Sequence, residues 1–340
     1  MRKLLSIVAA AAMVLSLAAC GSSGTAQTTA AAAGDAKTEQ AAPASSTKMT
    51  MGTGGTAGTY YAFGGVLGQY IKNKSGIDVT VVSTDGSKAN IQGIDAGDYQ
   101  LGTVQSDVMA YAWSGTKSFE SDGAVNSFRV VAGLYAETVQ LITMDPEIKS
   151  AADLKGKAVS IGAPGSGVYF NAMDVLAAAG LTESDINPQY LSFADSTEGL
   201  KDGKIDAAFI VAGAPTPAIT ELMTTNDAYL VPIDGEIAGK MMASCPYYTE
   251  LAIPAGTYPK QEADVTTVTV KATLIVNADA SEDDVYALTA AIFDNVSDIT
   301  AEHAKGAELS IENATAGMTA PFHAGAAKYF QEKGVKVEVQ

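Results

Sequence analysis

Segments with a strand pattern alternate with helical segments from residue 48 onward, and this alternation limits the fold more than any other feature. The expected strands cover residues 48–53, 79–83, 101–104, 129–134, 139–143, 158–161, 207–211, 229–233 and 266–276. The expected helices cover residues 60–74, 87–96, 106–111, 168–179 and 217–225, and a helical tail begins at residue 281. Strands that alternate with helices predict a parallel sheet with helices on its faces. We therefore expect an α/β fold.

Serines at three expected helix starts are candidate N-caps. Ser87 and Ser106 each follow a strand directly, and Ser281 precedes three acidic residues. A serine hydroxyl accepts a hydrogen bond from an unpaired N–H group of the first turn, and acidic residues there favour the helix dipole. All three serines are therefore expected to cap their helices.

The order of the elements suggests two lobes. The β-rich runs near Val139 and Val268 are placed to carry the chain from one domain to another and back. We expect residues 49–137 and 265–340 to form lobe 1 and residues 138–264 to form lobe 2. Residues 21–48 consist mainly of Ala, Ser, Thr and Gly, a composition that cannot bury enough apolar surface to offset its ordering entropy. We expect this segment to be a flexible tether.

The N-terminus has the pattern of an export signal. Arg2 and Lys3 precede an apolar run over residues 4–17, and Leu17-Ala18-Ala19-Cys20 follows. The run is shorter than the ~20 residues that span a bilayer. A Cys directly after Leu-Ala-Ala resembles a bacterial lipoprotein signal, in which Cys20 becomes the lipidated first residue. We expect an extracytoplasmic protein, lipid-anchored to a bacterial membrane. The alternative is a plain secretory signal, with Cys20 there by chance.

Composition excludes several classes of function. The net charge is −17, which opposes binding to nucleic acid. Apart from Cys20 the only cysteine is Cys245, and the two histidines, His303 and His323, lie outside known zinc motifs. No GxSxG nucleophile motif is present. We therefore expect no metal, no cofactor, no catalytic residues and no nucleic-acid partner.

A glycine-rich segment over residues 51–61 joins the first strand to the first helix. Glycines allow a close backbone approach, and the helix start adds unpaired N–H groups and a positive dipole end, so the turn suits an anion. A tight turn without a ligand is the alternative. Gly52, Gly54 and Ala57 approximate a dinucleotide fingerprint with Asp85, but that spacing is too long and nicotinamide cofactors are scarce outside the cell.

Three further polar loops follow strands, at residues 84–90, 105–107 and 162–169. Ligands of open α/β sheets bind outside the carboxyl ends of the strands, so these loops are expected to meet at a cleft. Arg129 is the only arginine after the signal, and Lys88 is the other cation near a loop. Either is as well explained as a surface charge. Recognition is therefore expected to depend on backbone N–H groups, hydroxyls and tyrosines.

Several stretches, in this order, resemble the TAXI-type solute receptors of tripartite (TRAP) transporters. They are MGTGGTAGTYYAFGG, STDGSKANI, LGTVQSDV, GLYAETVQLI, the segment over residues 148–181, IDAAFIVAGAPTPAI, the segment over residues 253–276, and APFHAGAAKYFQEKG. The resemblance implies a periplasmic-binding-protein fold of type II, with two lobes joined by hinge strands around a ligand cleft. It also implies a small carboxylate ligand, similar to glutamate, glutamine or 2-oxoglutarate, and a membrane permease driven by an ion gradient.

The resemblance also implies a set of ligand-facing residues. In lobe 1 these are Thr53, Gly55, Tyr60, Tyr61, Ser87, Gln105, Ser106 and Tyr135. In lobe 2 they are Ser166, Gly167, Val168, Gly213 and Pro215. Tyr60 and Tyr61 would form walls, with Ser87, Gln105 and Ser166 as hydrogen-bond partners. Where the family often has GSGT, this chain has Val168 in the last position, so one hydroxyl is missing and the exact solute is open.

The expected function is capture of a small organic acid for a TRAP permease. Three alternatives stay open. The first is a receptor of similar fold for an ATP-driven importer. The second is an exported enzyme that uses an acid such as Asp107. The third is a structural or adhesive surface lipoprotein.

Overall fold

The computed structural model describes residues 47–339, so Cys20 and nearly all of the predicted tether lie outside the described residues. The described strands form one sheet in the order β2-β1-β3-β10-β4-β7-β5-β6, with β8 paired to β4 and β9 to β10. The strands are β1 (Lys48–Gly52), β2 (Asp78–Val82), β3 (Leu101–Gln105), β4 (Phe128–Thr143), β5 (Ala158–Ser160), β6 (Asn187–Gln189), β7 (Ala207–Ala212), β8 (Tyr229–Val231), β9 (Thr249–Ile253) and β10 (Val265–Asn277).

Helices cover the sheet. The α-helices are α1 (Thr59–Ser75), α2 (Ser87–Asp95), α3 (Ser106–Ser114), α4 (Val168–Ala178), α5 (Phe193–Lys201), α6 (Pro217–Thr225), α7 (Gly235–Ser244), α8 (Glu282–Phe293), α9 (Val296–Glu302), α10 (Ile311–Thr315) and α11 (Ala324–Glu332). The short 3-10 helices are η1 (Lys117–Phe119), η2 (Ala151–Leu154), η3 (Glu183–Asp185) and η4 (Ala304–Glu308). Of the described helices, none is both long and apolar enough to cross a bilayer.

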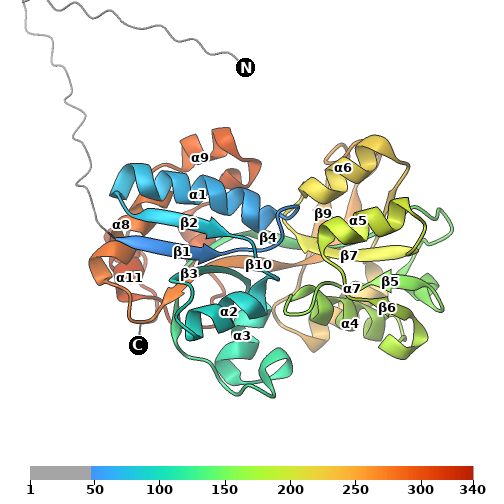
Figure 1. Cartoon of the computed structure of the whole chain (residues 1–340), viewed down its shortest axis with the longest axis horizontal. Helices are drawn as coiled ribbons and strands as arrows, with labels where there is room; N and C mark the ends of the chain where they lie inside the picture. Colours follow the sequence, from blue (N-terminus) through green and yellow to red (C-terminus); the bar gives the residue numbers. More distant parts are fainter. Residues whose placement is uncertain (1–46, 340) are drawn as a thin grey trace, which may run out of the picture. The chain divides into compact units, whose positions relative to one another are not determined.

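Two long neighbouring strands, β4 and β10, connect the two halves of the sheet (Figure 1). The N-terminal half of β4 pairs with β10 next to β3, and its C-terminal half pairs with β7 and β8. The two strands predicted at residues 129–134 and 139–143 are thus one strand. The ladder between β4 and β10 continues through Ala136, Glu137 and Thr138, where the sequence pattern predicts a break.

The predicted parallel sheet is a mixed one. β1 pairs in parallel with β2 and β3, and β5 pairs in parallel with β6 and β7. β10 is antiparallel to β3, β4 and β9, and β4 is antiparallel to β7 and β8. The antiparallel pairs arise because β4 leads out of one half of the sheet and β10 returns to it.

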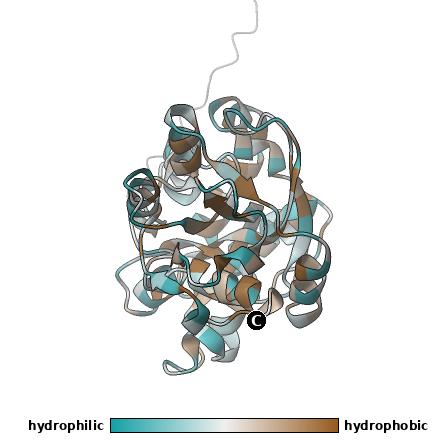
Figure 2. Cartoon of the chain, turned by 90° about the vertical axis from the view of Figure 1, so that its right-hand side faces the viewer, coloured by the Kyte–Doolittle hydropathy of each residue, from teal (hydrophilic) through white to brown (hydrophobic). Residues whose placement is uncertain are grey.

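Each half of the sheet has its own hydrophobic core. We call the half with β1–β3, α1–α3 and α8–α11 lobe 1, and the half with β5–β9 and α4–α7 lobe 2. The lobe 1 core includes Phe63 and Phe128 together with Phe330 from the C-terminal end of the chain. Two clusters form the lobe 2 core, around Phe209 and around Ile219. Hydrophobic residues concentrate on the inner strands, and hydrophilic residues on outer helices and loops (Figure 2).

Two of the three predicted serine caps are wrong. The N-caps of α2 and α3 are Gly86 and Gln105, and each serine is the first helical residue. The Ser87 hydroxyl instead accepts from the Gln105 N–H group (3.1 Å), and the Ser106 hydroxyl from the Lys271 N–H group (3.1 Å). Both hydroxyls therefore tie helices to strands. Ser281 is confirmed as a cap, because its side chain accepts from the N–H group of Asp284.

Candidate ligand site between the two lobes

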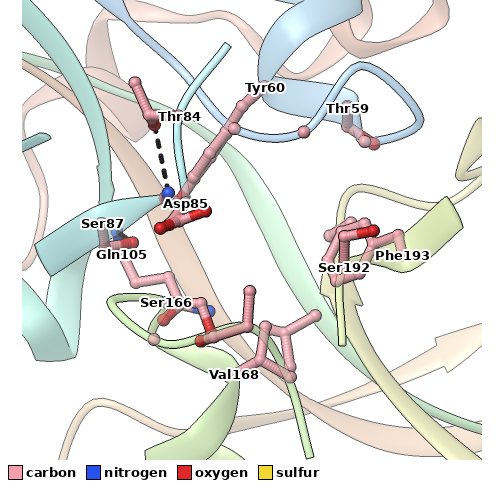
Figure 3. Close-up of a pocket in the computed structure, with 18 of the residues that line it drawn as sticks. Thr59, Tyr60, Thr84, Asp85, Ser87, Gln105, Ser166, Val168, Ser192 and Phe193 are labelled. Carbon is pink, nitrogen blue, oxygen red and sulfur yellow. Dashed lines mark hydrogen bonds between the residues drawn. The ribbon is translucent and has the colours of Figure 1, made fainter. Parts of the chain in front are cut away.

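Loops from both lobes enclose a cavity of about 80 Å³. It is lined by Gly54, Gly55, Gly58, Thr59, Tyr60, Thr84, Asp85, Gly86, Ser87, Gln105, Glu137, Ala163, Ser166, Gly167, Val168, Leu191, Ser192, Phe193, Val211 and Ala212. A hollow of about 300 Å³ that shares Gly55, Asp85 and Phe193 adjoins it. Figure 3 shows Tyr60 and Asp85 across the space from Ser192 and Phe193. The adjoining hollow reaches the lower end of the ~300–1,000 Å³ typical of small-molecule sites, and the enclosed cavity is smaller.

Three helices begin at this cavity without a side-chain cap. The N-caps of α1, α2 and α4 are Gly58, Gly86 and Gly167, which have no side chain to offer. The N–H groups of a first helical turn have no intrahelical partner, and the helix dipole makes this end positive. Two such N–H groups of α2, those of Lys88 and Ala89, are bound to the Gly165 carbonyl of the other lobe (3.1 and 3.3 Å). The other helix starts favour an anionic group in the cavity.

Buried polar atoms without partners line the same space. Glu137 is 1% exposed, Gln105 2% and Tyr60 9%, and the Oε1 atoms of the first two and the hydroxyl of Tyr60 lack a hydrogen-bond partner in the structure. Buried polar groups are nearly always satisfied, so these three indicate where a ligand would bind. Burial raises the pKa of Glu137 to about 8, and nearby Lys305, Tyr135 and Tyr60 partly oppose this shift.

Hydrogen bonds join the two lobes around the cavity. The Gln105 amide donates to Asn171 Oδ1 (3.0 Å), and the Asn171 amide donates to Asp107 Oδ2 (3.0 Å) and to the Tyr248 hydroxyl (2.7 Å). On the other side, the Thr59 hydroxyl donates to the carbonyl of Gly213 (2.7 Å). The lobes are therefore in the closed arrangement, with the cavity between them.

Gly167 permits this close approach. A Cβ atom there would lie 1.5 Å from Gln105 Oε1 and 2.8 Å from a methyl group of Val108. Gln105 has no freedom to move aside, because it is buried and its amide is held by Asn171. The backbone torsion φ of Gly167 is −76°, so it is the space and not the backbone conformation that requires glycine.

Seven of the thirteen predicted ligand-facing residues line the cavity: Gly55, Tyr60, Ser87, Gln105, Ser166, Gly167 and Val168. The hydroxyl of Ser166 donates to the Ala163 carbonyl within its own loop (2.7 Å), so its oxygen faces the ligand only as an acceptor. Val168 lines the cavity with its apolar side chain, where the related pattern has a hydroxyl.

The other six predicted residues lie outside the cavity lining. They are Thr53, Tyr61, Ser106, Tyr135, Gly213 and Pro215. The Thr53 hydroxyl donates to the Val82 carbonyl (2.7 Å), and Tyr135 is a core residue whose ring meets that of Phe63 edge to face. Tyr61 is only half-buried and Pro215 is exposed.

Both cations that sequence analysis singled out lie away from the cavity. Lys88 pairs with Asp122 (2.7 Å) and donates to the Ser118 carbonyl (2.6 Å). Arg129 lies over the ring of Trp113 (5.5 Å) and donates to the carbonyls of Asn126 and Phe128. Within residues 47–339, no lysine or arginine lines the cavity. A bound acid would therefore be held by neutral donors.

Sequence reasoning missed Glu137 and Phe193. Glu137 lies on β4 in an otherwise buried strand, and that setting is the pattern that should have drawn attention to it. Phe193 is the first residue of α5, which was not predicted, although Ser192 caps it by accepting from the Asp195 N–H group. The Phe193 ring packs over Gly58 of lobe 1, where an added Cβ would lie 3.3 Å away.

Asp107 and the two histidines lie outside the cavity lining. Asp107 is fully buried beside Asn171, and burial raises its pKa to about 6. His323 caps α11 by accepting from the Gly325 N–H group (3.2 Å). In the described part of the chain, no group of three or more potential metal ligands is placed to hold an ion.

The profile of the NMT1-like family matches residues 51–334, and the chain belongs to that family. A protein from Bordetella bronchiseptica RB50 is similar at 19% identity over 84% of this chain and 88% of that one, with a TM-score of 0.52. The periplasmic aliphatic sulphonate binding protein of Escherichia coli is 16% identical over 85% and 91%, with a TM-score of 0.45. The zinc-bound ligand-binding component of an ABC-type import system from Staphylococcus aureus is 10% identical over 76% and 79%, with a TM-score of 0.48.

These findings define the class of the protein. The predicted fold is confirmed: an α/β periplasmic-binding-protein fold with two lobes joined by hinge strands. The chain is thus a member of the NMT1-like family with a two-lobed α/β fold.

Proposed function

We propose that this protein captures a small organic acid, similar to glutamate, glutamine or 2-oxoglutarate, and delivers it to a membrane importer. The observation that supports this most is the meeting of the α1 and α4 helix starts, which have no side-chain cap, at one cavity that no described lysine or arginine lines. Backbone N–H groups at such positions bind carboxylates without a cationic side chain. Tyr60, Ser87, Gln105 and Ser166 are the side chains that we expect to contact the ligand, and the full predicted set stays a prediction.

Two importers are candidates for the partner. The similar Staphylococcus aureus protein is a component of an ABC-type import system, and the Escherichia coli relative is a periplasmic sulphonate receptor. The roles of these two proteins favour the ATP-driven importer, which we take as the first candidate. The motifs over residues 51–334 resemble those of TRAP receptors, which supports a permease driven by an ion gradient.

The remaining predictions complete the proposal. We propose that Cys20 is lipidated and that residues 21–48 form a tether to the membrane. Lobe 1 would consist of residues 49–137 and 265–340, and lobe 2 of residues 138–264. An anchored receptor meets its importer at a high effective concentration that the tether length sets.

A thermal-shift screen tests the ligand class. The protein is first unfolded and refolded to remove any ligand carried through purification. An acid at about 100 times its dissociation constant should stabilise the fold by ~2.7 kcal/mol, because it binds only the folded state. Neutral sugars of similar size are the control and should leave the melting temperature unchanged. If none of the acids raises the melting temperature, the proposed ligand class is wrong.

A further inference from the structure

The floor of the cavity holds a carboxyl group that the anion-binding helix starts do not explain. Glu137 lies where β4 passes between the lobes, opposite Val270 of β10. Its backbone carbonyl accepts from the Thr269 hydroxyl (2.8 Å), while its side-chain Oε1 is buried and has no partner. A site for an organic acid has no need of a buried acid unless the ligand also carries a donor.

Two tyrosine hydroxyls accompany this carboxyl group. The hydroxyls of Tyr60 and Tyr135 are buried and without a hydrogen-bond partner, and both lie near enough to Glu137 to shift its pKa. Glu137 and Tyr60 line the cavity with unused acceptor capacity, whereas Tyr135 lies in the lobe 1 core outside the lining. An ammonium group carries three N–H donors and no acceptor, which matches this set. An oxo group offers only acceptors, so it would bind only while Glu137 keeps its proton and would make no use of the carboxylate charge.

The charges around the cavity also favour a ligand with an ammonium group. Lys305 is the cation next to Glu137, but its side chain is 9% exposed and already paired with Glu308 (2.5 Å). Asp85 is a second acid on the cavity lining. A dicarboxylate oxo acid would add two negative charges to a site where no described cation lines the wall. The corresponding amino acid adds one charge fewer and pairs its ammonium group with Glu137.

Building on the proposed function, we infer that Glu137, with the hydroxyl of Tyr60, is the recognition site for the amino group of the ligand. The ligand is then an α-amino acid, with its carboxylate at the uncapped helix starts and its ammonium group at Glu137. Recognition of the amino group, and not only of the acid, sets the specificity of the receptor.

Binding of an amine at Glu137 has a proton balance that can be measured. The charged and titratable groups around Glu137 are Tyr60 on α1, Tyr135 on β4, Lys305 and Glu308 on η4, and Asp107 on α3. Because burial raises the Glu137 pKa to about 8, the free receptor holds a proton there at neutral pH. The ammonium group favours the carboxylate, so this proton passes to the buffer while the ligand keeps its own three. An oxo acid would instead keep Glu137 protonated.

Calorimetry on matched ligand pairs tests the inference. Glutamate is compared with 2-oxoglutarate, alanine with pyruvate, and leucine with 4-methyl-2-oxopentanoate, each at neutral pH in buffers of different ionisation enthalpy. In any pair that binds, we expect the amino acid to bind about 10- to 100-fold more tightly than its oxo acid, which is the effect of one hydrogen bond to a charged group. Binding of the amino acid should release about one proton. Equal or tighter binding of the oxo acid, or binding without proton release, would overturn the inference. If no member of any pair binds, the proposed function falls as well.

The variant Glu137→Gln isolates the carboxyl group. It should lose the proton release and about 10- to 100-fold of its affinity for the amino acid, while its affinity for the oxo acid changes less than about threefold. Glu312→Gln makes the same chemical change at an exposed position on α10 and should behave as the wild type. Circular dichroism checks that both variants fold. Unchanged amino-acid affinity and proton release in folded Glu137→Gln would exclude the assigned role.

Discussion

At the scale of single residues, the cavity is distinguished by what its polar groups lack. Glu137, Gln105 and Tyr60 each bury an atom without a partner, although unpaired buried groups of this kind cost about 1–3 kcal/mol each. These unpaired buried atoms all lie at one place, where the two lobes meet. Such a concentration is typical of a binding site, where a ligand supplies the missing partners.

Glu137 should make the stability of the free protein depend on pH. Its pKa rises from an ordinary 4.5 to about 8 on folding, so between these values the folded state holds more protons than the unfolded one. The free energy of unfolding should therefore fall as pH rises across this range, by up to ~1.4 kcal/mol per pH unit. Asp107, raised from 3.8 to about 6, adds a decrease of the same sign at the acidic end.

Urea unfolding without ligand, at several pH values from about 6 to 8, measures this slope. Glu137→Gln should be flatter than the wild type and more stable at the alkaline end, and Glu312→Gln should follow the wild type. A slope that stays the same in Glu137→Gln would show that Glu137 titrates normally in the folded state.

Some residues of the site could be predicted from the sequence and others could not. Gly55, Ser87, Gln105 and Gly167 lie in polar loops directly after strands, a position that predicts ligand contact in an α/β sheet. Glu137 does not lie in such a loop. A single acid in a strand is usually a surface residue, and only the pairing of β4 on both sides shows that this one is enclosed. The apolar residues around Glu137 in β4 are a local indication of burial, but the pairing of the strand on both sides is a tertiary property.

At the scale of elements, α4 is the helix that brings lobe 2 against lobe 1. It begins at Gly167 beneath the Gln105 side chain, and one turn later Asn171 bonds to Gln105 and Asp107. The start of α4 therefore serves two purposes, to line the cavity and to seal it. A change there should act on closure before it acts on folding.

Gly167→Ala should separate closure from stability. The new methyl group would clash with Gln105 in the closed arrangement only, so ligand affinity should fall by at least about tenfold as the competent population shrinks. The melting temperature of the free protein should change little. Gly239→Ala on exposed α7, where an added Cβ meets nothing within 4 Å, is the control. It should keep its affinity and gain up to ~1 kcal/mol of stability from helix propensity. Wild-type affinity in Gly167→Ala would mean that the closed contact is not needed for binding.

Elements were predictable where a local pattern was strong. Pro217 marks the start of α6, and the predicted helix over residues 217–225 matches it. β6, α5, α7 and β9 were not predicted. β9 is mostly exposed and begins with Thr249 and Glu250, so it is stable as a strand because it pairs with β10. Such pairing between distant segments is not visible in a window of a few residues.

At the scale of the whole molecule, function depends on where the receptor is held. Replacing Cys20 by serine should remove the proposed lipid attachment, because only a thiol is acylated at that position. Incorporation of labelled fatty acid and the membrane-bound fraction should then both be lost. Cys245→Ser is the matched control, since this buried cysteine lies inside the folded domain. Continued membrane binding of a processed Cys20→Ser protein would contradict the anchoring proposal.

The route of the chain through β4 and β10 also has a consequence for biosynthesis. Lobe 2 is built from one uninterrupted stretch of chain, whereas lobe 1 takes β10 and α8–α11 from the last quarter of the sequence. Tyr70 on α1 bonds to Glu302, 232 residues later, and Phe330 packs in the same core as Phe63. Contacts between such distant positions form slowly. If the chain is exported N-terminus first, as we propose, lobe 1 cannot be completed until the last helices have been made, and the chain would stay unfolded enough to be translocated.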